Sequence, residues 1–178
     1  MKNILLSCLL LVMVSCSNSQ VENNWSSVSY MFESGPLPPV YQYSFTVTIN
    51  KDGDGVVVGF IGSDLSNPSL TYEFKISKDS LIYLTDAINN SKILTEDIDE
   101  LPDGVRPVGG HLQKVRVIIA DDNPNFDRPP RVKESPYFPS DKYAGDLISL
   151  YKVIVSFVPQ NIWDDFNSKK EEYQKNSK

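Results

Sequence analysis

The chain has 178 residues and a formal net charge of −6, and 40% of its residues are hydrophobic and 11% aromatic. These values are typical of one folded domain with a sizeable core and exclude a disordered chain. An acidic chain without a basic stripe binds phosphate backbones poorly, so we expect no nucleic-acid partner.

The N-terminus has the pattern of a secretion signal. Lys2 precedes an apolar run over residues 4–14. As a helix this run would reach roughly 17 Å, too short for a hydrocarbon core of about 30 Å. It ends in Met13-Val14-Ser15-Cys16. These four residues resemble the lipobox of bacterial lipoproteins, in which an apolar residue and a small residue precede an invariant cysteine, although Met13 replaces the usual leucine.

The resemblance implies a lipid anchor in the cell envelope. Type II signal peptidase would remove residues 1–15, and Cys16 would carry acyl chains such as palmitate. Residues 17–24 would form a polar tether that spans at most about 29 Å. Ser17 is not the aspartate that retains many lipoproteins in the inner membrane, so the family rule favours the outer membrane.

Cleavage of this signal would remove one lysine and no acidic residue, which changes the formal charge from −6 to −7. The lipid, rather than charge, would therefore hold the domain at the membrane. Of the two cysteines, Cys8 leaves with the signal and Cys16 is acylated. The folded domain then has no thiol nucleophile, disulfide or cysteine-ligated metal, and we expect no cofactor.

The first half of the domain has the pattern of an antiparallel meander. Apolar and polar residues alternate along the segments 27–32, 41–49 and 70–76, as in strands with one buried face, and the apolar segment 56–61 follows a turn. Asp-Gly pairs within 50–55 supply the positive φ angles of a hairpin turn. The period then changes, and Ser77 precedes a segment with helical spacing over about 79–91.

The second half is predicted to return to strands and to end in a helix. Residues 112–120 alternate as a strand, and 121–142 form a long proline-rich loop. Residues 147–158 are apolar on both faces and are predicted to be a last, central strand. A helix begins near Asn161, and the charged tail 169–178 is expected to fray.

Together these elements predict a single α+β domain over residues 25–178. Its expected architecture is an antiparallel sheet of about five to six strands with two helices packed on one face. Val28–Phe32, Pro38–Tyr41 and the strand end Thr46–Ile49 are similar to the opening of small bacterial envelope lipoproteins of unknown function. Later in the chain, Gly109-Gly110 before a strand fits the same outline. This similarity implies no activity and supports only the single-domain reading.

Two groups of oxygen-bearing residues are candidates for metal or acid–base chemistry. Residues 50–55 match the start of a calcium loop, but the glutamate required at position twelve is Ile61, so we favour a plain hairpin. A second cluster comprises Asp121, Asp122 and Asp127, beside which Arg128 and Arg131 can neutralise the charge. A solvated loop with local ion pairs is the favoured interpretation, and we predict no metal site.

His111 is the only histidine, so a histidine-rich zinc site is impossible and any Ser-His-Asp site would have to use it. No nucleophile elbow accompanies it, and a structural or surface role is favoured. Arg106 is the best anion contact nearby. Four aromatic residues, Trp25, Tyr41, Tyr43 and Trp163, are candidates for a carbohydrate or peptide groove, although core packing is the commoner use of such residues.

These observations favour a non-enzymatic envelope lipoprotein that binds another molecule, with an envelope protein as the expected partner. The predicted recognition element is the 121–142 loop, because long loops in compact domains are often functional. We expect this loop to be dispensable for folding. Its candidate contact residues are Phe126, Arg128, Arg131, Tyr137 and Phe138.

Two alternatives remain open. The first is a carboxylate-based hydrolase acting in the envelope. It would need a deep pocket that contains at least two of Asp121, Asp122, Asp127, Glu100 and Asp103. The second is an inhibitor or immunity-type lipoprotein, which would present an exposed, rigid loop or sheet edge and no pocket.

Overall fold

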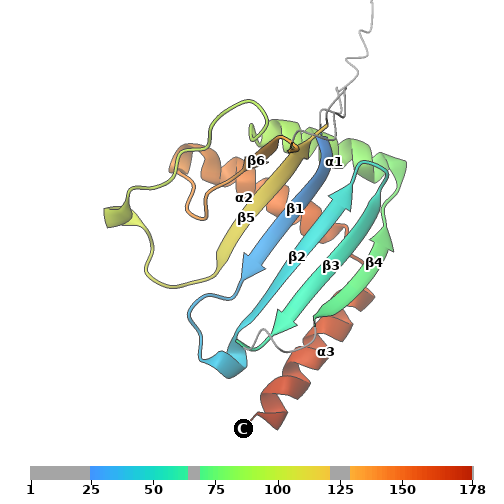
Figure 1. Ribbon diagram of the computed structural model, residues 1–178, viewed down its shortest axis with the longest axis vertical. Coiled ribbons are helices and arrows are strands. Elements are labelled where there is room, and N and C mark those ends of the chain that lie inside the picture. Colours follow the sequence, from blue (N-terminus) through green and yellow to red (C-terminus); the bar gives the residue numbers. More distant parts are fainter. Residues whose placement is uncertain (1–24, 64–68, 121–128, 178) are drawn as a thin grey trace, which may run out of the picture.

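The computed structural model describes residues 25–63, 69–120 and 129–177. The predicted signal, Cys16 and the tether lie outside these residues. Within them the chain forms an antiparallel sheet with helices behind one face (Figure 1). The strands are β1 (Trp25–Glu33), β2 (Tyr43–Asn50), β3 (Asp54–Ile61), β4 (Leu70–Lys75), β5 (Leu112–Ile119) and β6 (Val132–Glu134). The helices are α1 (Lys78–Asn90), α2 (Asp141–Ser156) and α3 (Gln160–Asn176), with 3₁₀ turns at Pro39–Tyr41 and Asp103–Val105.

The strand order is β4-β3-β2-β1-β5-β6, and all neighbouring pairs are antiparallel. The predicted α+β class is confirmed, with three helices in the described part of the chain instead of two. The meander β1 to β4 arises as predicted from alternation and short turns. The chain then passes through α1 and returns beside β1, so β1 lies inside the sheet.

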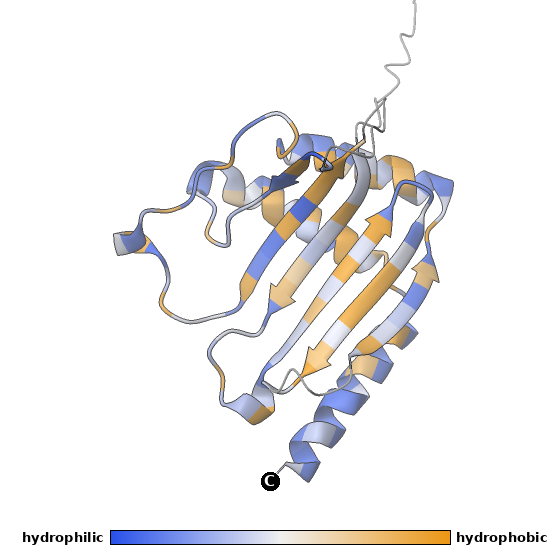
Figure 2. Ribbon diagram, in the orientation of Figure 1, coloured by the Kyte–Doolittle hydropathy of each residue, from blue (hydrophilic) through white to orange (hydrophobic). Residues whose placement is uncertain are grey.

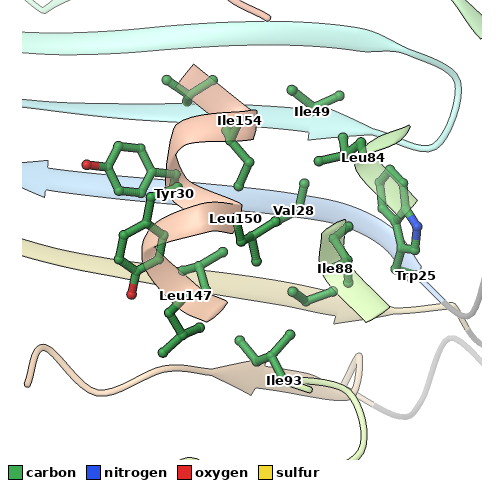
Figure 3. Close-up of a cluster of buried hydrophobic side chains, with 14 of the residues drawn as sticks. Trp25, Val28, Tyr30, Ile49, Leu84, Ile88, Ile93, Leu147, Leu150 and Ile154 are labelled. Atoms are coloured by element: carbon green, nitrogen blue, oxygen red, sulfur yellow. The ribbon is translucent and has the colours of Figure 1, made fainter. Parts of the chain in front are cut away.

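Residues 147–158, predicted to be a strand, belong to helix α2 and the turn that follows it. The buried residues of this segment are Leu147, Leu150, Tyr151, Ile154 and Val158. Their spacing is that of one helix face. The β-branched residues of this segment gave it a strand-like composition. The central position in the sheet is already taken by β1, and the buried side chains of α2 cover that strand from behind (Figure 3).

The predicted loop and tail also contain regular structure. Within 121–142, Val132–Glu134 form the edge strand β6, and Asp141 begins α2. The prediction that the charged tail frays is wrong: helix α3 continues through it to Asn176. Hydrophilic residues dominate the later turns of this helix (Figure 2). None of the helices in the described ranges is long and apolar enough to cross a membrane.

The core lies between the sheet and the helices. Val28 and Ile49 from the sheet meet Leu84, Leu150 and Ile154 from the helices, all with fully buried side chains (Figure 3). Helix α3 approaches β3 closely because residue 59 is glycine: a Cβ there would lie 2.4 Å from Cε2 of Phe166. The Phe166 ring takes the space that a side chain would fill.

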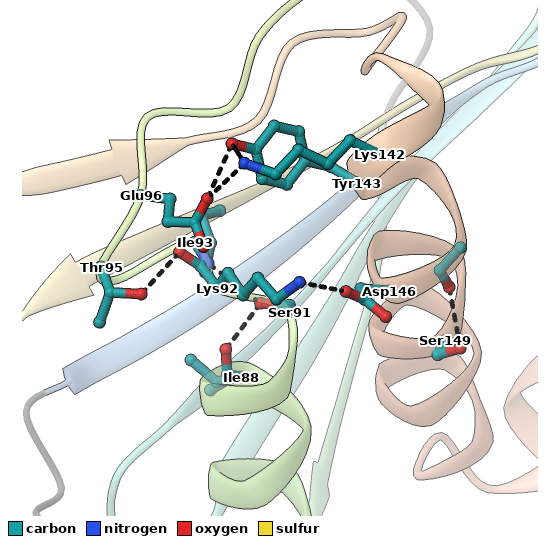
Figure 4. A network of polar contacts seen from close by, with 11 residues as sticks. Ile88, Ser91, Lys92, Ile93, Thr95, Glu96, Lys142, Tyr143, Asp146 and Ser149 are labelled. Atoms are coloured by element: carbon teal, nitrogen blue, oxygen red, sulfur yellow. Dashed lines mark hydrogen bonds and ion pairs between the residues drawn. The ribbon is translucent and has the colours of Figure 1, made fainter.

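A polar network joins the turn after α1 to the start of α2 (Figure 4). Nζ of Lys142 and the hydroxyl of Tyr143 each donate to Oε2 of Glu96 at 2.9 Å. Lys92 pairs with Asp146 at 3.4 Å. The hydrogen bond from Lys142 lowers the pKa of Glu96, and contacts with Tyr143 and Glu96 raise the pKa of Lys142. These contacts fix the orientation of α2 over the sheet.

Candidate functional site

Residues 50–55 form the hairpin between β2 and β3, as predicted. Oδ1 of Asn50 accepts backbone hydrogen bonds from Asp52 and Asp54 at 2.9 and 3.0 Å. The carboxylate of Asp54 pairs with Lys75 at 2.8 Å. Two of the three candidate ligands, Asn50 and Asp54, thus already accept hydrogen bonds, and Ile61, at the position that needs a glutamate, is buried in β3.

This hairpin should be indifferent to calcium. We expect the melting temperature to change by less than about 1 °C in millimolar CaCl₂, because a ligand that does not bind the folded state does not stabilise it. Thermal melts in CaCl₂, with MgCl₂ at equal ionic strength as the control, test this expectation. A rise of several degrees specific to calcium would show that the loop rearranges to hold the ion.

The charged candidates of the sequence do not form a catalytic pocket in the described residues. Asp121, Asp122 and Asp127 lie outside the described residues. The Arg106 guanidinium pairs with Glu100 at 3.0 Å and with Asp103 at 2.8 Å. Arg106 is therefore occupied rather than available to an anion, and its two carboxylates are neutralised at the surface.

The predicted interaction loop is partly a structural element. Phe126 and Arg128 lie outside the described residues, and their role in recognition stays a prediction. Arg131 is exposed, but its carbonyl accepts from the Ile119 amide at 2.9 Å. Tyr137 donates to Glu33 at 3.3 Å, and the carbonyl of Phe138 accepts from the Leu101 amide at 2.8 Å. These three described residues are therefore anchored to neighbouring elements.

The four aromatic candidates do not line one groove. Trp25 is 1% exposed, and its indole donates to Thr85 in the core at 3.1 Å. Tyr41 lies in a 3₁₀ turn. Tyr43 and Trp163 flank Phe45, from β2 and α3. Trp25 is thus at the opposite end of its strand from the other aromatic rings.

A cleft of about 470 Å³ opens between α2 and strands β1 and β5. We call it the α2 cleft. Three strand-side residues and five helix residues line it: Tyr30, His111, Gln113, Ile148, Tyr151, Lys152, Val155 and Ser156. Ile148 is 47% exposed although it is apolar. A concave, mostly apolar site with a few polar groups is the usual form of a ligand pocket.

Aromatic stacking holds His111 at the mouth of this cleft. Its ring lies over Phe32 with centroids 5.4 Å apart, and Phe32 stacks in turn on Phe45 at 5.0 Å. The loop that carries His111 crosses the end of β1, where a Cβ on Gly35 would lie only 1.7 Å from the Gly110 carbonyl oxygen. Glycine at position 35 therefore allows the two loops to meet.

Several polar groups of the α2 cleft lack protein partners. The hydroxyl of Tyr30 and the side chains of Gln113 and Lys152 make no hydrogen bond or ion pair with any described residue. Tyr30 is only 4% exposed, and its hydroxyl points along β1 away from the aliphatic core (Figure 3). Burial, and then the neighbouring Tyr151 and Tyr43, raise the pKa of Tyr30, so its hydroxyl is protonated and can donate.

Of the sequence candidates that the structure describes, only His111 lies in this cleft. Four other lining residues were not singled out from the sequence: Tyr30, Gln113, Ile148 and Lys152. Ile148 and Lys152 were missed because residues 147–158 were assigned to a strand instead of helix α2. The chain matches no protein-family model and is significantly similar to no curated protein. The cleft itself therefore carries the functional argument.

Proposed function

We propose that this protein is a lipid-anchored, non-enzymatic binding protein of the bacterial cell envelope, and that the α2 cleft is its ligand site. One observation carries this proposal: an apolar cleft into which polar groups point without protein partners. None of the described buried side-chain polar atoms lacks a hydrogen-bond partner, so the polar groups of the cleft reach solvent and are free to orient a ligand there.

The position of the cleft suits a tethered protein. The tether would join the domain at Trp25, at one end of β1, whereas His111 stacks on Phe32, near the other end of that strand. The mouth of the cleft would therefore face away from the membrane. A ligand in the envelope could reach it without passing between the domain and the lipid.

The cleft supports binding better than hydrolysis. None of the described residues that line it is acidic, and the carboxylates of Glu100 and Asp103 are held by Arg106 elsewhere. A carboxylate mechanism needs an acid and a base that face the same bound substrate. The inhibitor alternative predicted a domain without a pocket, so the cleft also weighs against it.

A neutral aromatic probe tests this proposal. We expect naphthylethanol to bind the full-length protein saturably, as measured by calorimetry in detergent micelles with empty micelles as the blank. Ile148→Glu should weaken this binding at least tenfold, because it places a charge in the apolar lining and can pair with Lys152 one helical turn later.

Ile82→Glu is the matched control. Ile82 is an exposed isoleucine on α1, 60% accessible and outside the cleft lining, so this variant should bind the probe like the unsubstituted protein. Absence of saturable binding, or equal binding by the Ile148→Glu variant, would contradict the assignment of the cleft.

A further inference from the structure

The described lining of the α2 cleft holds a lysine and no carboxylate, although the protein as a whole is acidic. Elsewhere, carboxylates neutralise many of the cations, with nitrogen-to-oxygen distances no longer than 4.0 Å. The cations paired in this way are Lys75, Lys92, Arg106, Lys114, Arg116, Lys133, Lys142 and Lys169. In the cleft, Lys152 has no acidic partner among the described residues, and His111 stands at the same opening.

We infer that the α2 cleft binds a small apolar carboxylate, whose hydrocarbon or aromatic body lies on Tyr30, Ile148 and Val155 and whose carboxylate meets Lys152. This inference rests on the proposed function and adds the class of ligand. The ammonium group of Lys152 has donors to spare, and a hydrogen bond between charged partners is about twice as strong as a neutral one.

The remaining polar groups fit the same ligand. The protonated Tyr30 hydroxyl and the amide of Gln113 can each donate to an oxygen atom at the cleft, as Lys152 does. A volume of about 470 Å³ lies within the range of small-molecule pockets. The cleft therefore offers an apolar surface and several donors at one site.

Cationic ligands fit the α2 cleft poorly. Aromatic rings can attract a cation through their faces, and Tyr30, Tyr151 and the nearby Phe32 would supply such faces. Lys152, however, would repel a cation at short distance, and the part of the lining that the structure describes holds no carboxylate to compensate. The positive charge of Lys152 should thus make the cleft bind carboxylates in preference to amines of the same shape.

Three ligands that share one aromatic body test the inference. We expect the full-length protein to bind naphthylacetate about tenfold more tightly than naphthylethanol, and naphthylethylamine most weakly, when titrated by calorimetry. Lys152→Met keeps the apolar stem and removes the charge, so it should abolish the preference for the acid over the alcohol. Lys152→Arg should retain the preference.

Lys78→Met is the control, because Lys78 is an exposed helix lysine outside the cleft, and it should leave all three affinities unchanged. Equal affinity for acid and alcohol, or a preference that survives in the Lys152→Met variant, would overturn the inference. Because binding of the alcohol and its loss in Ile148→Glu test the cleft separately, such a result would leave the proposed function standing. If the full-length protein binds none of the three ligands, both the inference and the proposed function are wrong.

Discussion

Cys16→Ser should release the protein from membranes completely. The lipobox resemblance implies that Cys16 is acylated, and an acidic domain without acyl chains would have no affinity for anionic lipid. We expect no labelling by an alkynyl palmitate analogue and recovery of the protein in the supernatant after a carbonate wash. Metabolic labelling followed by fractionation measures both.

Cys8→Ser provides the matched control. Cys8 lies in the predicted signal, ahead of the cleavage point, so its replacement should leave labelling and membrane retention unchanged. If the Cys16→Ser protein is still labelled, or stays in the membrane fraction, the lipid anchor is not at Cys16. The cleft and its ligand do not depend on that outcome.

Ser135→Ala should lower the free energy of unfolding by about 2 to 3 kcal/mol. Ser135 is 3% exposed, and its Oγ accepts the amide hydrogen of Val115 at 3.0 Å. It also bonds the Tyr151 hydroxyl at 3.2 Å. Alanine would leave the buried Val115 amide without an acceptor and would release Tyr151, which lines the α2 cleft. Urea denaturation followed by circular dichroism measures the change.

Ser156→Ala tests whether the loss is specific to position 135. Ser156 is exposed, and its hydroxyl donates to the Val153 carbonyl within α2 at 2.8 Å. Removing that bond should change the unfolding free energy by less than about 0.5 kcal/mol. A similarly small effect of Ser135→Ala would mean that water replaces its hydroxyl and that the segment before α2 is not structural.

The role of Ser135 corrects the expectation that the 121–142 segment is dispensable for folding. Replacing residues 123–139 by a flexible linker would remove β6 as well as Ser135. It would also remove Glu134, whose carboxylate pairs with both Lys114 and Arg116. The loss of stability should therefore be large, so a deletion cannot separate a recognition role from a structural one.

Short-range patterns in the sequence determined most of the sheet. Alternation of apolar and polar residues places β1 to β5, because a strand with one buried face repeats every two residues. Asn50 and Gly53 specify the hairpin through a side-chain acceptor and a positive φ. Ser77 caps α1 as predicted, accepting from the Ser80 amide at 3.1 Å. Each of these signals acts over a few residues and needs no distant partner.

Tertiary structure alone decided the identity of α2 and the cleft beside it. The apolar pattern of residues 147–158 is compatible with both a buried strand and the buried face of a helix. The helix forms because the space that this segment fills lies behind β1, where a helix packs on the sheet. Tyr30 and Lys152 are unremarkable in sequence, and His111 is notable only as the single histidine. They line one cleft because the register of β1 with β5 and the packing of α2 bring them together, and no local pattern encodes a site whose residues lie up to 122 positions apart.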